Sequence, residues 1–315
     1  MSFPQGELRD AERVNLAGTD RAGRECLSHT RIGTYLACSQ RYQWQYVRRL
    51  EQAVRPEALS RGAAFAHALE TGSPQSGFSV VMEEHAALIE EHGNSVWVSL
   101  PSESDALRVA TIVRAAACAY LARYGQQDVR REVTLRQVLR NPSTGCASRT
   151  FDVMARIDGQ TGSTLIEDKF SARVDAITDQ RLRLDRQTML GAYLLWRCEG
   201  VDVTEVKYRV TKTPSIKQKQ AESLEEYLSR VECDYRDRPD FYLHEFTLTF
   251  SRTDFLRLEH ELWDWAHQIR HANAAGVYPR NVASCADYSG CKFLGLCARE
   301  PGAIHQFTER ERSLR

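Results

Sequence analysis

The sequence lacks a net charge and a long apolar run. Its 42 Lys and Arg residues balance 42 Asp and Glu residues, so any binding to nucleic acid must come from a local basic groove. No apolar stretch reaches the length of about 18 residues that indicates a membrane span. The opening residues MSFPQGELRD also lack the basic and then apolar layout of a signal peptide. We therefore expect a cytoplasmic protein with no membrane partner.

Two further features are missing. No internal repeat is present, and no Gly-x4-Gly-Lys-Ser/Thr stretch is available to cradle nucleotide phosphates, so the chain carries no helicase motor of its own. A length of 315 residues is compatible with one large core bearing helical additions or with two domains.

The nine cysteines do not suggest a disulfide framework, because the expected compartment keeps thiols reduced and the chain is no small secreted scaffold. Most are scattered, and each is interpreted as a small buried hydrophobe. Cys285, Cys291 and Cys297 differ, since they are evenly spaced in the glycine-containing stretch CADYSGCKFLGLC. This spacing predicts thiolates that converge on a metal ion or a cluster.

The apolar periodicity changes along the chain. The first third has helical spacing and predicts helices over 31–50, 57–72, 79–91 and 103–124. Segments rich in β-branched and aromatic residues follow and predict strands over 131–139, 149–158, 164–170, 205–210 and 241–250. One helix over 179–197 interrupts the strands, and a last helix runs from Ser251 or Thr253 to Gly276. The pattern indicates a mixed α/β (α+β) fold.

A predicted hairpin brings acidic residues together. A two-residue turn at Thr161-Gly162 would place Asp158 opposite Leu165. Asp158, Glu167 and Lys169 would then share one face of the sheet. The other face would receive an apolar set: Val153, Ile157, Ile166 and Phe170.

Two carboxylates on neighbouring strands, diagonal at roughly 7–8 Å, suit one shared Mg²⁺ or Mn²⁺ ion. Lys169 would add a positive charge that orients a water molecule or neutralises charge on a phosphate during phosphodiester hydrolysis. Glu-x-Lys at the end of a strand is also common as a solvated ion pair, and this interpretation stays open for the triplet alone.

The order of the motifs resembles the PD-(D/E)XK nuclease superfamily, in particular its RecB/AddB-type branch with an iron–sulfur cluster. It is similar to that of CRISPR-associated spacer-processing nucleases and phage exonucleases. The resemblance extends from about Ser28 to Cys297. It implies a restriction-endonuclease-like core, in which a central mixed sheet is flanked by helices, with an N-terminal helical region and a C-terminal cluster loop.

The resemblance also implies roles for single residues. The implied metal ligands are His67, Asp158, Glu167 and the backbone carbonyl of Asp168; the implied catalytic residues are Asp158, Glu167, Lys169 and Gln187. Relatives carry a DNA-contacting tyrosine four residues after the glutamine, where this chain has Gly191, and Tyr193 is the nearest tyrosine. The candidate DNA contacts are Arg41, Arg48, Arg183 and Tyr193.

Four cysteines match those that hold a [4Fe–4S] cluster in the resembled nucleases, namely Cys38, Cys285, Cys291 and Cys297. The first gap of the C-terminal set is wider than the usual Cys-x2-Cys. Zn²⁺ therefore stays an alternative to the cluster, and Cys26 an alternative to Cys38.

The resemblance predicts a metal-dependent DNA nuclease, an exonuclease on single-stranded or free DNA ends, in a bacterial or phage-infected cell. Recombination, helicase or CRISPR-related proteins are candidate partners. The alternatives are a DNA-binding or assembly factor with little catalysis and a zinc-stapled nucleic-acid-binding protein. The expected divisions are a flexible N-terminus (1–25), a helical region (26–127), the nuclease core sheet (128–250), a last helix with the cysteine loop (251–298) and a tail (299–315).

Overall fold

The computed structural model describes residues 23–96, 98–125, 129–171, 174, 178–286 and 290–310. Within these ranges no helix combines the length and the apolar character needed to cross a membrane. The chain forms two compact units. The first comprises the described residues of Met1–Gln52, Val138–Met154 and Glu259–Arg315, and the second those of Ala53–Gln137 and Ala155–Leu258.

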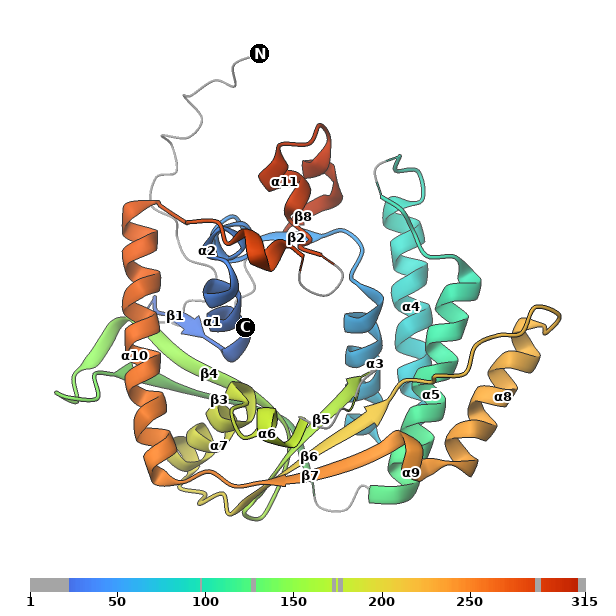
Figure 1. Ribbon diagram of the computed structural model, residues 1–315, viewed down its shortest axis with the longest axis horizontal. Helices are drawn as coiled ribbons and strands as arrows, with labels where there is room; N and C mark the ends of the chain where they lie inside the picture. The colour runs from blue at the N-terminus through green and yellow to red at the C-terminus, as the bar shows by residue number, and fades with distance from the viewer. Residues whose placement is uncertain are drawn as a thin grey trace. The chain divides into compact units, whose positions relative to one another are not determined.

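The second unit has a layer of helices (Figure 1). Its members are α3 (Glu57–Thr71), α4 (Pro74–His92), α5 (Glu103–Tyr124) and α8 (Leu224–Asp237). Helix α3 ends where the sequence predicts, because Gly72 adopts the left-handed conformation with φ 65°. Helix α8 was not expected from the sequence, although Ser223 and Glu226 form a capping box at its start.

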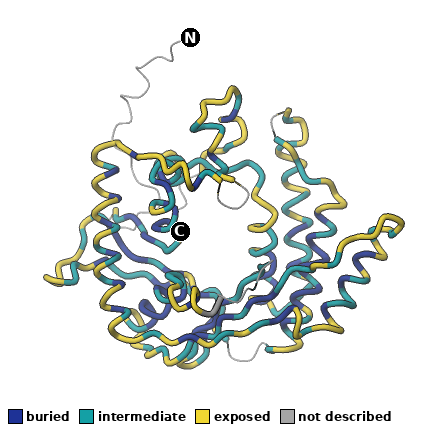
Figure 2. Tube along the Cα trace, viewed as in Figure 1, coloured by how far each residue is buried: buried dark blue, intermediate teal, exposed yellow. Residues whose placement is uncertain are grey.

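The helical layer packs around α5, whose middle is buried (Figure 2). Val113 and Tyr120 of α5 lie in one apolar cluster with Phe65 of α3 and Val231 of α8. The Phe65 and Tyr120 rings meet edge to face, with their centroids 5.9 Å apart. Burial of these side chains provides most of the free energy that holds the four helices together.

The central sheet is mixed, as the sequence predicts. Its strands in the second unit are β3 (Arg130–Arg140) in large part, the end of β4 (Ala147–Thr161), β5 (Thr164–Ser171), β6 (Glu205–Lys212) and β7 (Leu243–Leu248). Strand β5 is antiparallel to β4 and parallel to β6, β7 is antiparallel to β6, and β3 pairs with β4.

Helices α3 and α7 (Arg186–Glu199) both contact β5. Phe170 of β5 stacks on Phe65 of α3, whereas the adjacent Lys169 donates a hydrogen bond to Gln187 of α7. Successive side chains of a strand point to opposite faces. The two helices therefore cover opposite faces of β5.

The β4–β5 hairpin is shifted from its predicted register. Thr161 pairs with Thr164 and Gly159 with Ile166, so the turn is Gly162-Ser163, with Gly162 at φ 52°. Leu165 therefore pairs with Gln160, and Asp158, one step beyond this ladder, is not opposite Leu165. The shift arises because the left-handed glycine is the first turn residue and not the second.

One apolar assignment on this hairpin is also wrong. Ile157 was expected on the same face as Phe170. It lies instead against α7, where a Cβ at Gly191 would be 2.9 Å from Ile157 Cγ2 and 3.5 Å from Leu165 Cδ2. The alternation of β4 is thus interrupted next to Asp158, where the ladder with β5 ends.

Two long predicted helices are interrupted. The segment 31–50 breaks at Cys38, whose backbone is extended (φ −164°, ψ 114°). It forms α1 (His29–Ala37), α2 (Ser39–Tyr42), a π-helical turn (Gln43–Val47) and, from Leu50, strand β2 (Leu50–Gln52). The segment 179–197 divides into α6 (Thr178–Leu182) and α7, because Asp185 accepts a hydrogen bond from Thr188 N at 3.0 Å and caps α7.

The first unit contains the described ends of the chain. Its other elements are β1 (Glu25–Leu27), most of α10 (Arg252–Ala275), a 3₁₀ turn (Val282–Cys285), α11 (Leu294–Ala298), a second 3₁₀ turn (Ala303–Gln306) and β8 (Phe307–Glu309); the short helix α9 (Pro239–Tyr242) belongs to the second unit. Strand β1 is parallel to β4, and β8 is antiparallel to β2.

The structure differs from the expected loose ends at 1–25 and 299–315. Buried Glu25 begins β1, and residues 307–309 pair with β2. Arg310 then donates from Nε to Glu51 Oε2 at 2.6 Å. Residues 1–22 and 311–315 lie outside the described ranges.

Candidate active site

Strand β5 presents Glu167 and Lys169 to helix α7. The Glu167 carboxylate is 1% exposed, and Lys169 Nζ donates to its Oε1. Lys169 Nζ also donates to Gln187 Oε1 at 3.0 Å. The structure thus brings together three of the residues that the sequence assigns to catalysis.

Asp158 joins this group from the end of the β4–β5 ladder. Its Oδ2 accepts a hydrogen bond from the backbone N–H of Asp168 at 2.8 Å. The carboxylate is half-buried and carries a charge that acts on both Glu167 and Lys169. Asp158 is therefore oriented by the backbone of β5 itself.

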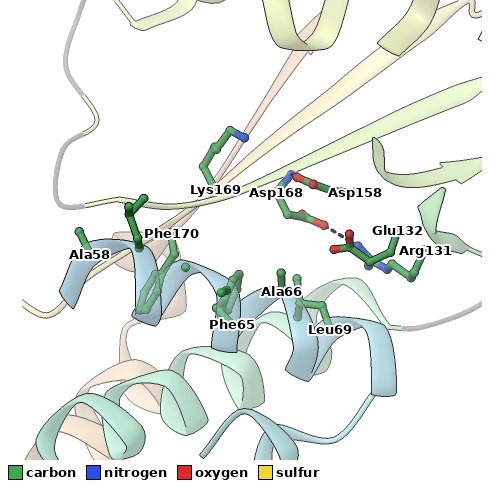
Figure 3. Close-up of a pocket in the computed structure, with 13 residues that line it drawn as sticks. Ala58, Phe65, Ala66, Leu69, Arg131, Glu132, Asp158, Asp168, Lys169 and Phe170 are labelled. Atoms are coloured by element: carbon green, nitrogen blue, oxygen red, sulfur yellow. Dashed lines mark hydrogen bonds and ion pairs between the residues drawn. The ribbon is translucent and has the colours of Figure 1, made fainter. Parts of the chain in front are cut away.

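A cleft of about 330 Å³ opens beside these residues. One wall is apolar and comes from α3 between Ala58 and Leu69, together with Phe170. The other wall is formed by Arg131, Glu132, Asp158, Asp168 and Lys169. In Figure 3, Lys169 points away from α3 while Phe170 points toward it, in agreement with the alternation along β5.

Burial and negative charge set the protonation behaviour of the site. Burial, reinforced by the Asp158 carboxylate, raises the pKa of Glu167 well above its ordinary value despite the nearby ammonium of Lys169. Burial by itself would lower the pKa of Lys169. The negative charges of Glu167 and Asp158 outweigh this effect, so the pKa of Lys169 is raised. The site therefore keeps a charged lysine among carboxylates whose repulsion a divalent cation would relieve.

Only some of the metal ligands that the sequence predicts come together in the structure. Carboxylate and carbonyl oxygens fit Mg²⁺ or Mn²⁺, and Mg²⁺ usually keeps several water ligands. Within the described ranges, however, no group of three or more His, Cys, Asp and Glu side chains is placed to hold a metal ion. His67 is thus not gathered with Asp158 and Glu167; its Nδ1 lies 3.8 Å from Glu70 Oε2 on α3.

Glu132 was not identified from the sequence, although it lines the cleft. It adopts φ 54°, which is uncommon for a residue other than glycine and typical of strained positions near functional sites. Its side chain is 12% exposed and pairs with Arg156. Burial, together with Asp158, raises the pKa of Glu132 despite the nearby Arg156 guanidinium. A positive φ has no sequence signature unless the residue is Gly or Asn, so no local pattern indicated this residue.

The expected DNA contact from Tyr193 is not supported by its position. Tyr193 is 4% exposed, its hydroxyl accepts from Gln137 Nε2 at 3.3 Å, and its ring packs against Phe255. These contacts are those of a side chain that packs in the core between helices. A tyrosine would not fit at position 191, because α7 approaches Ile157 too closely there.

The three candidate DNA-binding arginines occur in both units. Arg41 of α2 and Arg48 belong to the first unit, and Arg183, between α6 and α7, belongs to the second. Arg48 and Arg183 are exposed and Arg41 is half-buried. Their DNA-binding role stays a prediction.

The four predicted cluster cysteines all belong to the first unit. Cys38 Sγ accepts a hydrogen bond from Asn281 N at 3.4 Å, and Cys285 Sγ lies 3.9 Å from Asn281 O. Cys291 N donates to Cys285 O at 2.9 Å, and Cys297 follows in α11. The segments that carry the cysteines are therefore adjacent, although no three of these thiols are placed to hold one metal ion in the described part of the chain.

Comparison with known families decides which class of protein this geometry belongs to. A family model described as the PD-(D/E)XK nuclease superfamily matches residues 26–298. The chain belongs to this superfamily. The match extends over the mixed sheet, the helices around it and the cysteine segments, and members of the superfamily are nucleases.

Solved structures give weaker likenesses. The chain is similar to a crystal structure described as a "putative exonuclease" from Eubacterium rectale, with 10% identity, 96% of this chain and 99% of that chain covered, and a TM-score of 0.47. It is also similar to a phage related exonuclease from Haemophilus somnus 129PT, with 10% identity, 64% and 83% covered, and a TM-score of 0.29. A search of curated proteins gave no match. These scores are too low to support an argument, and the family membership depends on the family model.

Proposed function

We propose that this protein is a Mg²⁺- or Mn²⁺-dependent deoxyribonuclease that hydrolyses phosphodiester bonds at single-stranded or free DNA ends. The observation that carries the proposal is the position of Lys169, which binds Glu167 and Gln187 and lines a cleft together with Asp158. Membership of the nuclease superfamily supports the same reaction. Helicase, recombination or CRISPR-related partners stay predictions.

Each residue of the group has a chemical task. Asp158, Glu167 and the backbone carbonyl of Asp168 would hold the divalent cation, which polarises the phosphate and acidifies water when it is bound. Lys169 places its ammonium where charge develops on the phosphate. Gln187 fixes the direction of that ammonium through its 3.0 Å hydrogen bond.

The size of the cleft favours a strand end as the substrate. Its volume of about 330 Å³ is near the lower end of the range for small-molecule sites, roughly 300–1,000 Å³. A site of this size suits one nucleotide better than an intact duplex. The apolar wall can contact a base or sugar, while the charged wall faces the phosphate.

The decisive experiment is digestion of end-labelled single-stranded and double-stranded DNA with Mn²⁺, Mg²⁺ or chelator. We expect metal-dependent release of nucleotides that is lost in Asp158→Ala and Lys169→Ala. Lys207→Ala is the matched control, because Lys207 lies in the neighbouring strand β6 and does not line the cleft. Undiminished activity in Lys169→Ala would overturn the catalytic assignment. DNA binding by folded wild-type protein without any cleavage would favour the alternative of a binding or assembly factor.

We further propose that Cys38, Cys285, Cys291 and Cys297 hold a structural [4Fe–4S] cluster. The support is the contact of Asn281 with both Cys38 and Cys285 and the backbone link from Cys285 to Cys291. Anaerobically purified protein should contain about four iron and four acid-labile sulfide per chain. Zinc in place of iron and sulfide would instead establish the zinc-stapled alternative.

A further inference from the structure

The side chain of Asp168 lies on the face of β5 opposite the catalytic residues. It is 4% exposed and points toward α5. Its Oδ1 accepts a hydrogen bond from Tyr120 OH at 2.6 Å, and its Oδ2 accepts one from Arg131 Nη1 (Figure 3 shows the Arg131 and Asp168 side chains). Both carboxylate oxygens therefore have a buried partner, one from helix α5 and one from strand β3.

The contacts continue across the sheet. Arg209 of β6 donates from Nη1 to Tyr120 OH at 3.0 Å and from Nε to Glu245 of β7 at 2.8 Å. One polar network thus joins strands β3, β5, β6 and β7 to α5. Each oxygen of the buried Asp168 carboxylate has a partner in this network, and such hydrogen bonds rigidify the backbone that carries the carboxylate.

Gly159 makes room for this network at the next residue after Asp158. A Cβ at Gly159 would lie 2.8 Å from Val129 Cγ1 and 3.4 Å from Arg131 Nη1. The absent side chain allows the Arg131 guanidinium to pass β4 and reach Asp168 on β5.

We propose that Asp168, Tyr120 and Arg131 are positioning residues for the active site. Residue 168 lies between Glu167 and Lys169, and its backbone N–H donates to Asp158 at 2.8 Å. Holding the Asp168 carboxylate in place therefore also positions three residues of the proposed site. Asp158 is positioned through its hydrogen bond from the Asp168 N–H, and Glu167 and Lys169 are positioned because they adjoin Asp168 in the chain. The inference rests on the proposed metal-dependent nuclease activity and assigns to that site a support that acts on metal affinity.

Two variants remove this support with little change in shape. Tyr120→Phe deletes one hydroxyl, and Asp168→Asn replaces an acceptor-only carboxylate by an amide. Tyr124→Phe is the matched control, because Tyr124 stands one helical turn from Tyr120, with ring centroids 4.8 Å apart, and its hydroxyl has no hydrogen-bond partner among the described residues. Circular dichroism and thermal melting verify that each variant folds.

Mn²⁺ affinity is the measurement that a general loss of stability would leave unchanged. Electron paramagnetic resonance of free Mn²⁺, measured without DNA, should give a dissociation constant raised by about tenfold or more in Tyr120→Phe and Asp168→Asn, the scale seen when groups that orient metal ligands are removed. The kcat on labelled DNA should fall at limiting Mn²⁺ and recover at saturating Mn²⁺, with the KM for DNA unchanged. Tyr124→Phe should match the wild type in every measurement.

Unchanged Mn²⁺ affinity and kcat in folded Tyr120→Phe and Asp168→Asn would overturn the positioning role while leaving the nuclease assignment intact. Wild-type protein that neither binds Mn²⁺ nor cleaves DNA would contradict the nuclease assignment, and the positioning role with it. The wild-type measurement therefore separates the two failures.

Discussion

Glu167 places a buried carboxylate where its charge is costly for the fold. It pairs with Lys169, yet burial and the Asp158 charge still raise its pKa well above the ordinary value. An acid whose pKa is raised by folding contributes most to stability at low pH, and this contribution is lost as the pH rises through the raised pKa. The charged form of Glu167 therefore lowers the stability of the fold.

Glu167→Gln tests this balance. The amide removes a proposed metal ligand, so we expect Mn²⁺-dependent cleavage to fall by at least about 100-fold, more than for groups that only orient ligands. Because the buried charge is removed too, the melting temperature in chelator at neutral pH should equal or exceed that of the wild type. Glu205→Gln in β6, which removes the charge of the carboxylate that accepts from the Thr164 hydroxyl, is the control and should remain active. Full activity of Glu167→Gln would contradict the assignment.

Gly191 shows how closely α7 packs on the sheet. Since an added Cβ would lie 2.9 Å from Ile157 Cγ2, we expect Gly191→Ala to lower the free energy of unfolding by about 1–3 kcal/mol. Urea denaturation followed by circular dichroism measures it. In the control, Gly62→Ala of α3, the new Cβ meets nothing within 4 Å, so the helix should be unchanged or stabilised by up to about 1 kcal/mol. Equal stability of the two variants would show that α7 can move aside.

At the scale of elements, α8 is the helix that the sequence analysis missed. Its signals were present: the Ser223 and Glu226 capping box, and Tyr227, Val231 and Tyr235 on one buried face. The helix completes the layer around α5 on the face of the sheet to which Asp168 points. The turn that precedes it is fixed by Glu222.

Glu222 gives α8 a pH-dependent anchor. It accepts hydrogen bonds from Arg230 and from Lys219 N, and these contacts lower the pKa of Glu222 from 4.5 to about 2. The stabilisation is therefore present above pH 4.5 and is lost as the pH falls toward 2. We expect Glu222→Gln to lower the melting temperature at neutral pH, with a difference that narrows in acid. Exposed Glu225→Gln, in the first turn of α8, is the control. A difference that stays constant with pH would contradict the anchor.

At the scale of the whole molecule, the proposed catalytic residues and the cysteine segments belong to different units. Asp158, Glu167, Lys169 and Gln187 belong to the second unit, and the four cysteines to the first. The first unit is assembled from both ends of the described chain, through β1 on β4 and β8 on β2. A cluster held by Cys38 and the C-terminal cysteines would connect these distant segments covalently.

Removal of the proposed cluster should therefore loosen the first unit. After oxidative loss of iron, limited proteolysis should cut within residues 23–52 or 259–310 well before it cuts the second unit, since a metal site contributes folding free energy where it is bound. Cys297→Ser should behave in the same way, and Cys146→Ser, at an exposed turn between β3 and β4, should remain resistant. Identical cleavage of iron-loaded and iron-depleted protein would contradict a structural cluster.

Local sequence patterns were sufficient to predict much of the fold. Periodicity located α3, α4, α5 and the strands β3 to β7, because helical and extended spacing of apolar residues are properties of short windows. The order of acid, Glu-x-Lys and glutamine indicated which residues meet, and the structure brings Glu167, Lys169 and Gln187 into direct contact. Interruptions at Cys38 and Asp185 were missed because each depends on a single backbone conformation or cap.

The sequence by itself determined the class of fold, since this follows from spacing along single strands and helices, and its resemblance in motif order predicted the acids and the lysine of the proposed site. Only the tertiary structure decided the register that pairs Leu165 with Gln160 and not with Asp158, and the burial of Tyr193. The tertiary structure alone showed that Tyr120 and Arg131 contact the Asp168 side chain. In the sequence they precede Asp168 by 48 and 37 residues. Contacts at such separations depend on how helices and strands pack, and no local window contains that information.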